Sequence, residues 1–171
     1  MIEFFAPSTY QRASNNRYRH SMPTTTPAIA TTSELVSHFA SKLQFETDPS
    51  DVFADFEAGK RFVLVDSRGD AAWQQGRIRG AIHLPTAEIT RRATDEIALD
   101  VPVVVYCWGP GCNGSTRAAL EFARLGFQVR EMIGGYEYWA REGYPTEDDA
   151  GPILRTKDDL TAPLDTISCD C

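Results

Sequence analysis

The chain has 171 residues, enough for one domain with a hydrophobic core and too few for two of ordinary size. Apolar residues make up 42% of the chain and charged residues 24%, which is typical of a globular rather than a disordered protein. The 17 Lys and Arg against 24 Asp and Glu give a formal net charge of −7, which disfavours a general nucleic-acid binder, and no apolar run approaches the roughly 20 residues that span a bilayer.

Residues 1–32 are predicted to form a flexible N-terminal extension. Their apolar run, residues 2–6, is too short for a secretory signal and contains Glu3. We therefore expect a cytoplasmic protein, and in that reducing compartment paired cysteines are more often reactive than structural. A transit peptide is the alternative, since residues 11–20 contain three arginines and no acid.

The middle of the chain alternates between predicted helices and strands. Ser33 suits the N-cap of the first helix, Pro49 the first turn of the second, and Gly126 the end of the fourth. The helices are predicted at residues 34–43, 49–59, 71–75, 115–125 and 136–142, and the strands at residues 62–66, 81–85, 101–106 and 128–133. This alternation indicates an α/β fold with a mainly parallel sheet and helices on both faces.

A glycine-rich loop follows the strongest predicted strand and begins at Cys107. Ligands of open parallel sheets bind at the carboxyl ends of strands, which is where Cys107 lies. The loop glycines let several N–H groups point inward, and the next helix adds the N–H groups of its first turn. This arrangement favours an anion at the loop centre, and we expect it to lower the pKa of the Cys107 thiol.

Two reactions suit a thiolate in such a loop. One is attack on a sulfane sulfur to give a cysteine persulfide, and the other is attack on phosphate or arsenate. Cys112 in the same loop is either a bystander or a resolving thiol that captures Cys107 as a disulfide. The competing interpretation of Cys107 is a small apolar filler at the end of a buried strand.

Four segments of the chain, in order, resemble the rhodanese-like single-domain sulfurtransferase family. The resemblance covers about residues 33–145. The segments are Leu64-Val65-Asp66-Ser67-Arg68 followed by Trp73, residues 76–85 (GRIRGAIHLP), Val104-Val105-Tyr106-Cys107 with its loop and residues 117–119 (RAA), and residues 134–139 (GGYEYW).

The resemblance implies a rhodanese-like α/β domain with a roughly five-stranded, mainly parallel sheet and helices on both faces. It also implies that Cys107 is the catalytic nucleophile and carries the persulfide. The loop that would cradle the sulfur or an anionic donor comprises Trp108, Gly109, Pro110, Gly111, Cys112, Asn113, Gly114 and Ser115. Asp66, Arg68 and Arg117 would support the loop.

The loop departs from the family pattern in two ways. It is about two residues longer than in the sulfurtransferases, and a larger loop suits phosphate or arsenate. It also holds no Arg or Lys before Arg117. A thiol that cleaves phosphate usually needs a loop arginine that clamps the oxyanion, so the composition argues against phosphatase chemistry.

The sequence therefore predicts a sulfurtransferase that moves sulfane sulfur from a small anionic donor such as thiosulfate to a thiol, cyanide or protein acceptor. No cofactor, metal, nucleic acid or membrane is expected to take part. The alternatives are a thiol-based redox or arsenate-type reductase that uses Cys107 and Cys112, and a non-catalytic rhodanese-like binding module.

Residues 146–171 are predicted to be a loosely attached acidic tail, since they carry seven acidic and two basic residues. The tail ends in Cys169 and Cys171, which are either incidental or a mobile thiol pair that accepts sulfur from Cys107.

Overall fold

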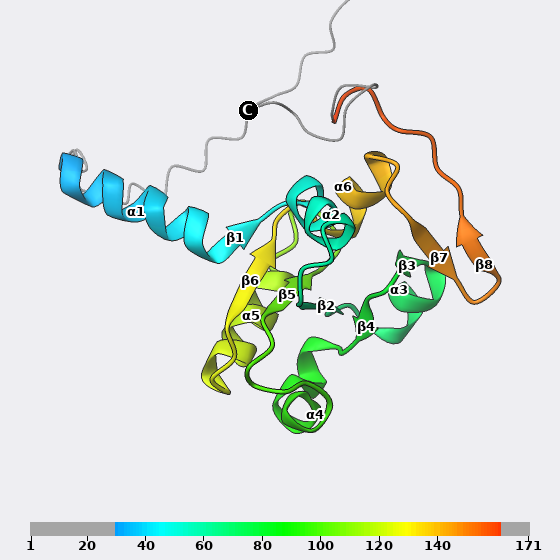
Figure 1. The fold of residues 1–171 in the computed structure, drawn as a ribbon, viewed down its shortest axis with the longest axis horizontal. Coiled ribbons are helices and arrows are strands. Elements are labelled where there is room, and N and C mark those ends of the chain that lie inside the picture. The colour runs from blue at the N-terminus through cyan, green and yellow to red at the C-terminus, as the bar shows by residue number, and fades with distance from the viewer. Residues whose placement is uncertain (1–29, 162–171) are drawn as a thin grey trace, which may run out of the picture. The chain divides into compact units, whose positions relative to one another are not determined.

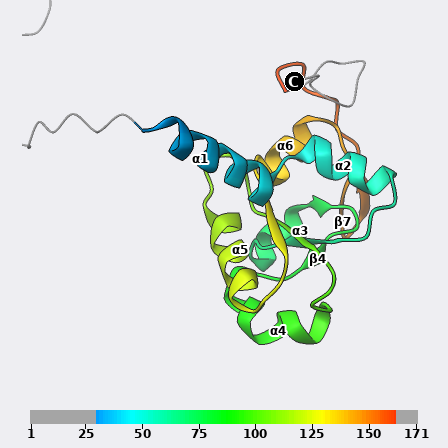
Figure 2. The same cartoon turned by 60° about the vertical axis from the view of Figure 1, so that its left-hand side comes forward.

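The structure, a computed structural model, describes residues 30–161, and its elements belong to one compact unit that begins at Thr32 (Figures 1 and 2). No helix in this part of the chain is long and apolar enough to cross a membrane. In chain order the elements are α1 (Thr32–Phe45), β1 (Glu46–Thr47), α2 (Pro49–Glu57), β2 (Val63–Asp66), α3 (Asp70–Gln75), β3 (Arg77–Ile78), β4 (Ile82–His83), the 3₁₀ helix η1 (Thr86–Glu88), α4 (Ile89–Glu96), β5 (Val103–Tyr106), α5 (Gly114–Arg124), β6 (Val129–Met132), α6 (Gly135–Arg141), β7 (Thr146–Asp148) and β8 (Gly151–Ile153).

Five strands form a parallel sheet in the order β1-β6-β5-β2-β4, which confirms the predicted fold class. The central strand, β5, is buried along its whole length, as expected for a parallel strand covered on both faces. In the register of β2 and β5, Asp66 lies opposite Tyr106. Cys107 follows Tyr106 directly, so it sits at the carboxyl edge in the middle of the sheet.

Alternating side chains of the sheet build a separate core on each face. Val103 and Val105 join one core, and Val104 and Tyr106 join the other. Helices α4 and α5 cover the first face, while α2 and α6 pack side by side over the second (Figure 1). The sheet is therefore closed to water on both faces, and its carboxyl edge carries the glycine-rich loop.

The capping signals read from the sequence act as predicted in α2. Asp48 accepts a hydrogen bond from the Asp51 N–H at 2.9 Å, and Pro49 occupies the first turn. Gly59 follows the helix with a φ of +66°, a conformation that favours glycine. In α5, which forms where a helix was predicted, Phe122 is fully buried.

Two helical segments differ from expectation. Helix α1 forms where it was predicted, but none of its residues is buried. Residues 86–96 were not predicted to be helical, although they form η1 and α4. The buried residues Ile89, Ala93 and Ile97 recur every four positions, and this spacing is the signal that was missed.

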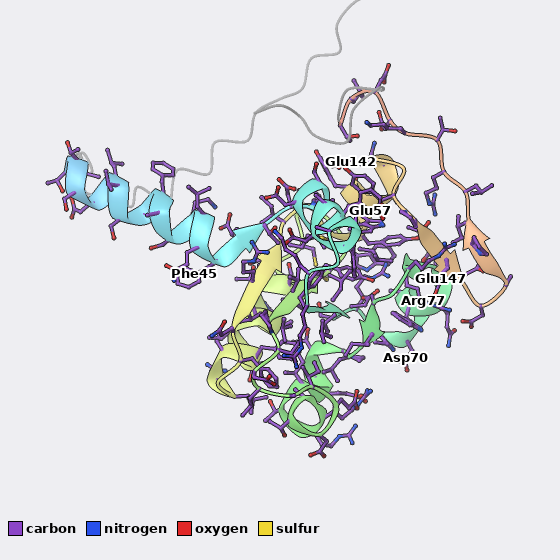
Figure 3. The ribbon with its side chains drawn as sticks, in the orientation of Figure 1. Phe45, Glu57, Asp70, Arg77, Glu142 and Glu147 are labelled. Carbon is purple, nitrogen blue, oxygen red and sulfur yellow. The ribbon has the colours of Figure 1, made fainter. Side chains whose placement is uncertain are left out.

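The predicted acidic tail is folded over its first residues, which corrects its description as loosely attached. Strands β7 and β8 form an antiparallel hairpin that pairs with β3. Thr146 is buried, and Arg77 forms ion pairs with Glu147 at 3.5 Å and with Asp149 at 2.8 Å (Figure 3). The hairpin shields the edge of β3, so it belongs to the domain. Residues 1–29 and 162–171, with Cys169 and Cys171, lie outside the described residues.

Candidate active site

The loop after β5 brings two thiols into contact. The Cys107 Sγ lies 3.0 Å from the Cys112 Sγ, and both cysteines are free. Cys107 is only 7% exposed, whereas Cys112 is partly exposed. A hydrogen bond of 3.0 Å from the Cys112 N–H to the Gly109 carbonyl closes the turn between them. The two predicted loop cysteines thus form a pair of touching thiols, of which Cys107 is buried and Cys112 is partly exposed.

Helix α5 begins directly beneath the two sulfurs, at Gly114. The Gly114 N–H donates to the Cys112 Sγ at 3.4 Å. A Cβ at Gly114 would overlap the Cys107 sulfur and approach the Cys112 sulfur to 3.2 Å. Asn113, the N-cap residue, makes no side-chain cap, so its side chain leaves the first-turn N–H groups to other acceptors. Only glycine lets the thiols reach the positive end of this helix.

Helix α6 binds the backbone of the loop from the other side. The Tyr136 N–H donates to the Cys107 carbonyl at 2.9 Å, and the Glu137 N–H donates to the Trp108 carbonyl at 2.8 Å. Gly135 makes this contact feasible, since its φ is +57° and a Cβ there would lie 2.6 Å from the Cys107 carbonyl oxygen. Gly135 and Tyr136 were not predicted in the site; the Gly134-Gly135 pair is the signal for such a close backbone approach.

Asp66 and Arg68, the predicted supporting residues, form a buried ion pair. Their side chains are 0% and 1% exposed. Arg68 Nε donates to Asp66 Oδ1 at 2.9 Å, and the Tyr106 hydroxyl donates to Asp66 Oδ2 at 2.7 Å. Arg68 Nη2 also donates to the Gly76 carbonyl at 2.7 Å. Because buried charges cost free energy unless they are paired and hydrogen-bonded, these contacts offset the cost of burying the Asp66–Arg68 pair.

The Arg68 guanidinium lies over two aromatic rings of the site, which are nearly perpendicular to each other. Its central carbon lies 4.6 Å from the centre of the Trp108 ring and 4.3 Å from that of Tyr136. Burial lowers the pKa of Arg68, but the hydrogen bond and charge of Asp66 raise it overall, so the guanidinium stays charged. Arg68 therefore contacts Trp108, the residue after Cys107, and Tyr136, whose N–H binds the Cys107 carbonyl.

The pKa values of the two thiols contradict the prediction made for Cys107. Burial and the neighbouring Cys112 raise the pKa of Cys107 to about 11, so the expected lowering is wrong. Burial is the largest single influence on the pKa of Cys112 and raises it, but the hydrogen bond with Cys107 and several smaller contacts together lower it overall. The Gly114 N–H, the Trp108 N–H and the Arg117 charge act in the same direction. The loop thus lowers the pKa of the more exposed thiol, Cys112, and not that of Cys107.

The other predicted loop residues have different surroundings. Trp108, Pro110, Gly111, Asn113 and Arg117 are exposed, while Gly109 is half-buried. Ser115 is buried, and its hydroxyl donates to Glu131 at 2.8 Å. Glu131 also accepts a hydrogen bond from Thr116 at 2.9 Å. Glu131 was not predicted in the site; an acidic residue near the carboxyl end of a buried strand is the signal for it.

A cavity of about 470 Å³ opens beside Cys112. Its wall includes the carboxylates Asp48, Glu131 and Glu142, and among the described residues that line it there is no Lys or Arg. Burial raises the pKa of Glu142, whose Oε2 has no hydrogen-bond partner among the described residues. Glu142 lies just beyond α6 (Figure 3). The sulfurs meet N–H donors, but the adjoining cavity is acidic and disfavours anions.

The sequence matches the family model of the rhodanese-like domain over residues 49–142. The chain belongs to the rhodanese-like domain family. The matched range runs from the start of α2 to the end of α6, and thus includes both cysteines, the Asp66–Arg68 pair and the Gly-Gly motif.

The rhodanese-like domain is similar to proteins of two kinds. The thiosulfate sulfurtransferase GlpE of Pseudomonas fluorescens is 38% identical over 92 residues, which cover 52% of this chain and 79% of that protein. The HTH-type transcriptional regulator Rv0324 of Mycobacterium tuberculosis is 34% identical over 94 residues, which cover 55% of this chain and 41% of the regulator. This chain therefore spans less than half of the regulator and most of the sulfurtransferase.

Solved structures show the same fold. The BH2092 protein of Bacillus halodurans has a TM-score of 0.66 and 36% identity, with 78% of this chain and 93% of that chain covered. The rhodanese-like domain of the Alr3790 protein from Anabaena has a TM-score of 0.56 and 27% identity, with 60% and 78% covered. Both solved structures thus share the fold of this chain.

Replacing Asp66 by Ala is expected to lower the free energy of unfolding by about 3–5 kcal/mol, because it leaves the buried Arg68 without a counter-charge. Chemical denaturation followed by circular dichroism measures this change. Asp100→Ala is the matched control, since Asp100 pairs with Arg61 at the surface and its side chain is 69% exposed. An equal loss of stability in both variants would contradict the assigned role of Asp66.

Replacing Cys112 by Ser is expected to lower the pKa of Cys107, since the neighbouring sulfur contributes to raising it. The thiolate is the reactive form, so Cys107 should become reactive toward iodoacetamide at a lower pH in the variant than in the wild-type protein. Peptide mass spectrometry locates the alkylated cysteine in both proteins. Superimposable pH profiles for Cys107 would contradict the coupling.

Proposed function

We propose that this rhodanese-like domain is a sulfurtransferase that carries sulfane sulfur as a persulfide on Cys107. The position of Cys107 carries the proposal: its thiol lies at the carboxyl end of the central strand, above the first turn of α5, and α6 holds its carbonyl. The 38% identity to a protein named thiosulfate sulfurtransferase supports the same activity.

In the first step Cys107 gives its proton to the contacting Cys112 thiolate, the thiol whose pKa is lowered, and the Cys107 sulfur attacks the outer sulfur of the donor. With thiosulfate, the sulfur–sulfur bond of the donor breaks and its electron pair leaves with sulfite. The N–H groups at the start of α5 stabilise negative charge on the thiolate and on the resulting persulfide. In the second step an acceptor takes the outer sulfur: cyanide becomes thiocyanate, and a small thiol or protein thiol becomes a persulfide. A reducing compartment such as the cytoplasm keeps both loop thiols free.

Two alternatives have weaker support. A phosphatase or arsenate reductase needs a free guanidinium in the loop, but the loop between Cys107 and Arg117 contains no arginine. The Arg68 side chain, which is nearby, is bound by Asp66. A non-catalytic binding or sensing module agrees with the similarity to a transcriptional regulator. The buried, oriented Cys107 favours catalysis over that alternative.

Release of sulfite from thiosulfate tests the first step. Wild-type protein, reduced and freed of small thiols, is expected to release about one sulfite per chain in a single turnover. In Cys107→Ser the release should fall to the uncatalysed rate. This variant keeps Cys112, Cys169 and Cys171, so it controls for reaction at the other thiols. Undiminished release by Cys107→Ser would refute the assignment of the nucleophile.

A second experiment tests the contact between Gly114, at the start of α5, and the two sulfurs. Gly114→Ala places a methyl group against both sulfurs and is expected to slow sulfite release by about tenfold or more, since small displacements of reacting groups cost rate steeply. Gly111→Ala adds a methyl group that meets nothing within 4 Å and should lose much less activity. Thermal unfolding of both variants shows whether the fold is kept. Equal rates in both variants would exclude a role for the Gly114 contact.

A further inference from the structure

The distance between the two loop thiols is close to that of a bond. The Cys107 and Cys112 sulfurs are 3.0 Å apart, and an S–S bond of about 2.05 Å needs them to approach by only about 1 Å. Both thiols are free, and the turn from Gly109 to Cys112 holds the second over the first. A disulfide between them is therefore within reach of a small movement of the loop.

The two thiols are not equally accessible. Cys112 forms part of the wall of the acidic cavity, while Cys107 is not among the residues that line it. An acceptor that enters this cavity therefore meets Cys112 before it meets a persulfide on Cys107. A thiol already in contact also has an effective concentration that a dissolved thiol does not reach. Among the described residues, Cys112 is thus the thiol nearest to a persulfide on Cys107.

We propose that Cys112 discharges the Cys107 persulfide within the same chain and releases hydrosulfide, so that the domain acts as a dithiol-dependent sulfane-sulfur reductase. This proposal rests on the proposed function, since it needs Cys107 to accept a sulfur first. It assigns to Cys112 a catalytic role in the second half of the reaction, in place of an external sulfur acceptor.

The atoms and electrons of the discharge balance as follows. The Cys112 thiol gives its proton to the outer sulfur of the persulfide, and the Cys112 sulfur attacks the Cys107 sulfur. A bond forms between the two cysteine sulfurs, and the bond between Cys107 and the outer sulfur breaks. Its electron pair leaves with the outer sulfur as HS⁻. The two cysteines lose two electrons to form a disulfide, and the transferred sulfur gains them.

A dithiol restores the starting state. One of its sulfurs attacks the exposed Cys112 sulfur, and its second thiol closes the dithiol's own disulfide, which returns two thiols to the loop. The carboxylates of Asp48, Glu131 and Glu142 favour an uncharged or cationic reductant in the adjoining cavity. Dithiothreitol, an uncharged dithiol, is the probe that this predicts to work.

The test is a single turnover of the full chain with thiosulfate in the absence of any added thiol. Sulfite is measured directly, and hydrosulfide is collected as H₂S after acidification. Trypsin cleaves after Arg92 and Arg117, with no Lys or Arg between them, so one peptide carries both loop cysteines and neither terminal one. The mass of that peptide distinguishes a persulfide from an internal disulfide.

Wild-type protein is expected to release about equal amounts of sulfite and sulfide, and its 93–117 peptide should be lighter by two hydrogen atoms. In Cys112→Ser, whatever sulfite is released should come without sulfide, and for each sulfite one peptide should be heavier by one sulfur atom. Dithiothreitol added afterwards should restore the wild-type peptide mass and a second turnover.

Two results would overturn the proposal in distinguishable ways. If wild-type protein releases sulfite but keeps the extra sulfur on its peptide, the discharge by Cys112 is refuted and the sulfurtransferase function stands. If neither wild-type protein nor Cys112→Ser releases sulfite or gains sulfur, the proposed function fails with thiosulfate, and the discharge fails with it.

Discussion

The position of the cysteine loop depends on one buried charge pair. Asp66 ends β2, and in the sheet register it lies opposite Tyr106, the residue before Cys107. Its carboxylate accepts hydrogen bonds from Arg68 and from the Tyr106 hydroxyl, so the ends of two neighbouring strands are tied at the edge where the loop begins. Arg68 in turn contacts the Trp108 and Tyr136 rings. An apolar pair in this place would fill the space but would not fix these directions.

The same pair shows why chemistry and stability are joined in this domain. Tyr136 stacks on Arg68 and also donates its N–H to the Cys107 carbonyl. The Gly-Gly motif brings α6 close enough for that bond, and Gly114 brings α5 close enough to touch both sulfurs. A strand end, two helix starts and one ion pair thus converge on a single thiol. Because each contact restricts the others, a small error in any of them moves the sulfur.

The larger periodic elements could be predicted from the sequence. The apolar run of β5 predicted a strand, and Pro49 predicted the start of α2. The short strands β1, β3, β7 and β8 were missed, because two or three residues are too few to show an alternating pattern and they form only through pairing. Distant partners of this kind are set by the packing of the whole chain.

Within the site, residue positions were easier to predict than charges. The loop and the Asp66–Arg68 pair lie where the motifs placed them. The predicted lowering of the Cys107 pKa was wrong for a physical reason: helix ends and N–H groups favour a thiolate, but they do not determine which of two touching sulfurs carries it. Burial is the largest influence on the pKa of each sulfur, and the order of residues does not reveal how deeply a loop side chain is buried.

The C-terminal hairpin has a consequence for where this domain ends. Strand β7 pairs with β3 through Ile78 and Thr146, yet the family model stops at residue 142. A chain cut at that point would leave the backbone of β3 without its partner strand and would expose Ile78, which is fully buried in the intact domain. Open strand edges with apolar neighbours recruit other chains. The hairpin therefore covers the edge of β3, and Pro152, which has no backbone N–H, lies in its own outer strand β8, where prolines are typical of sheet edges.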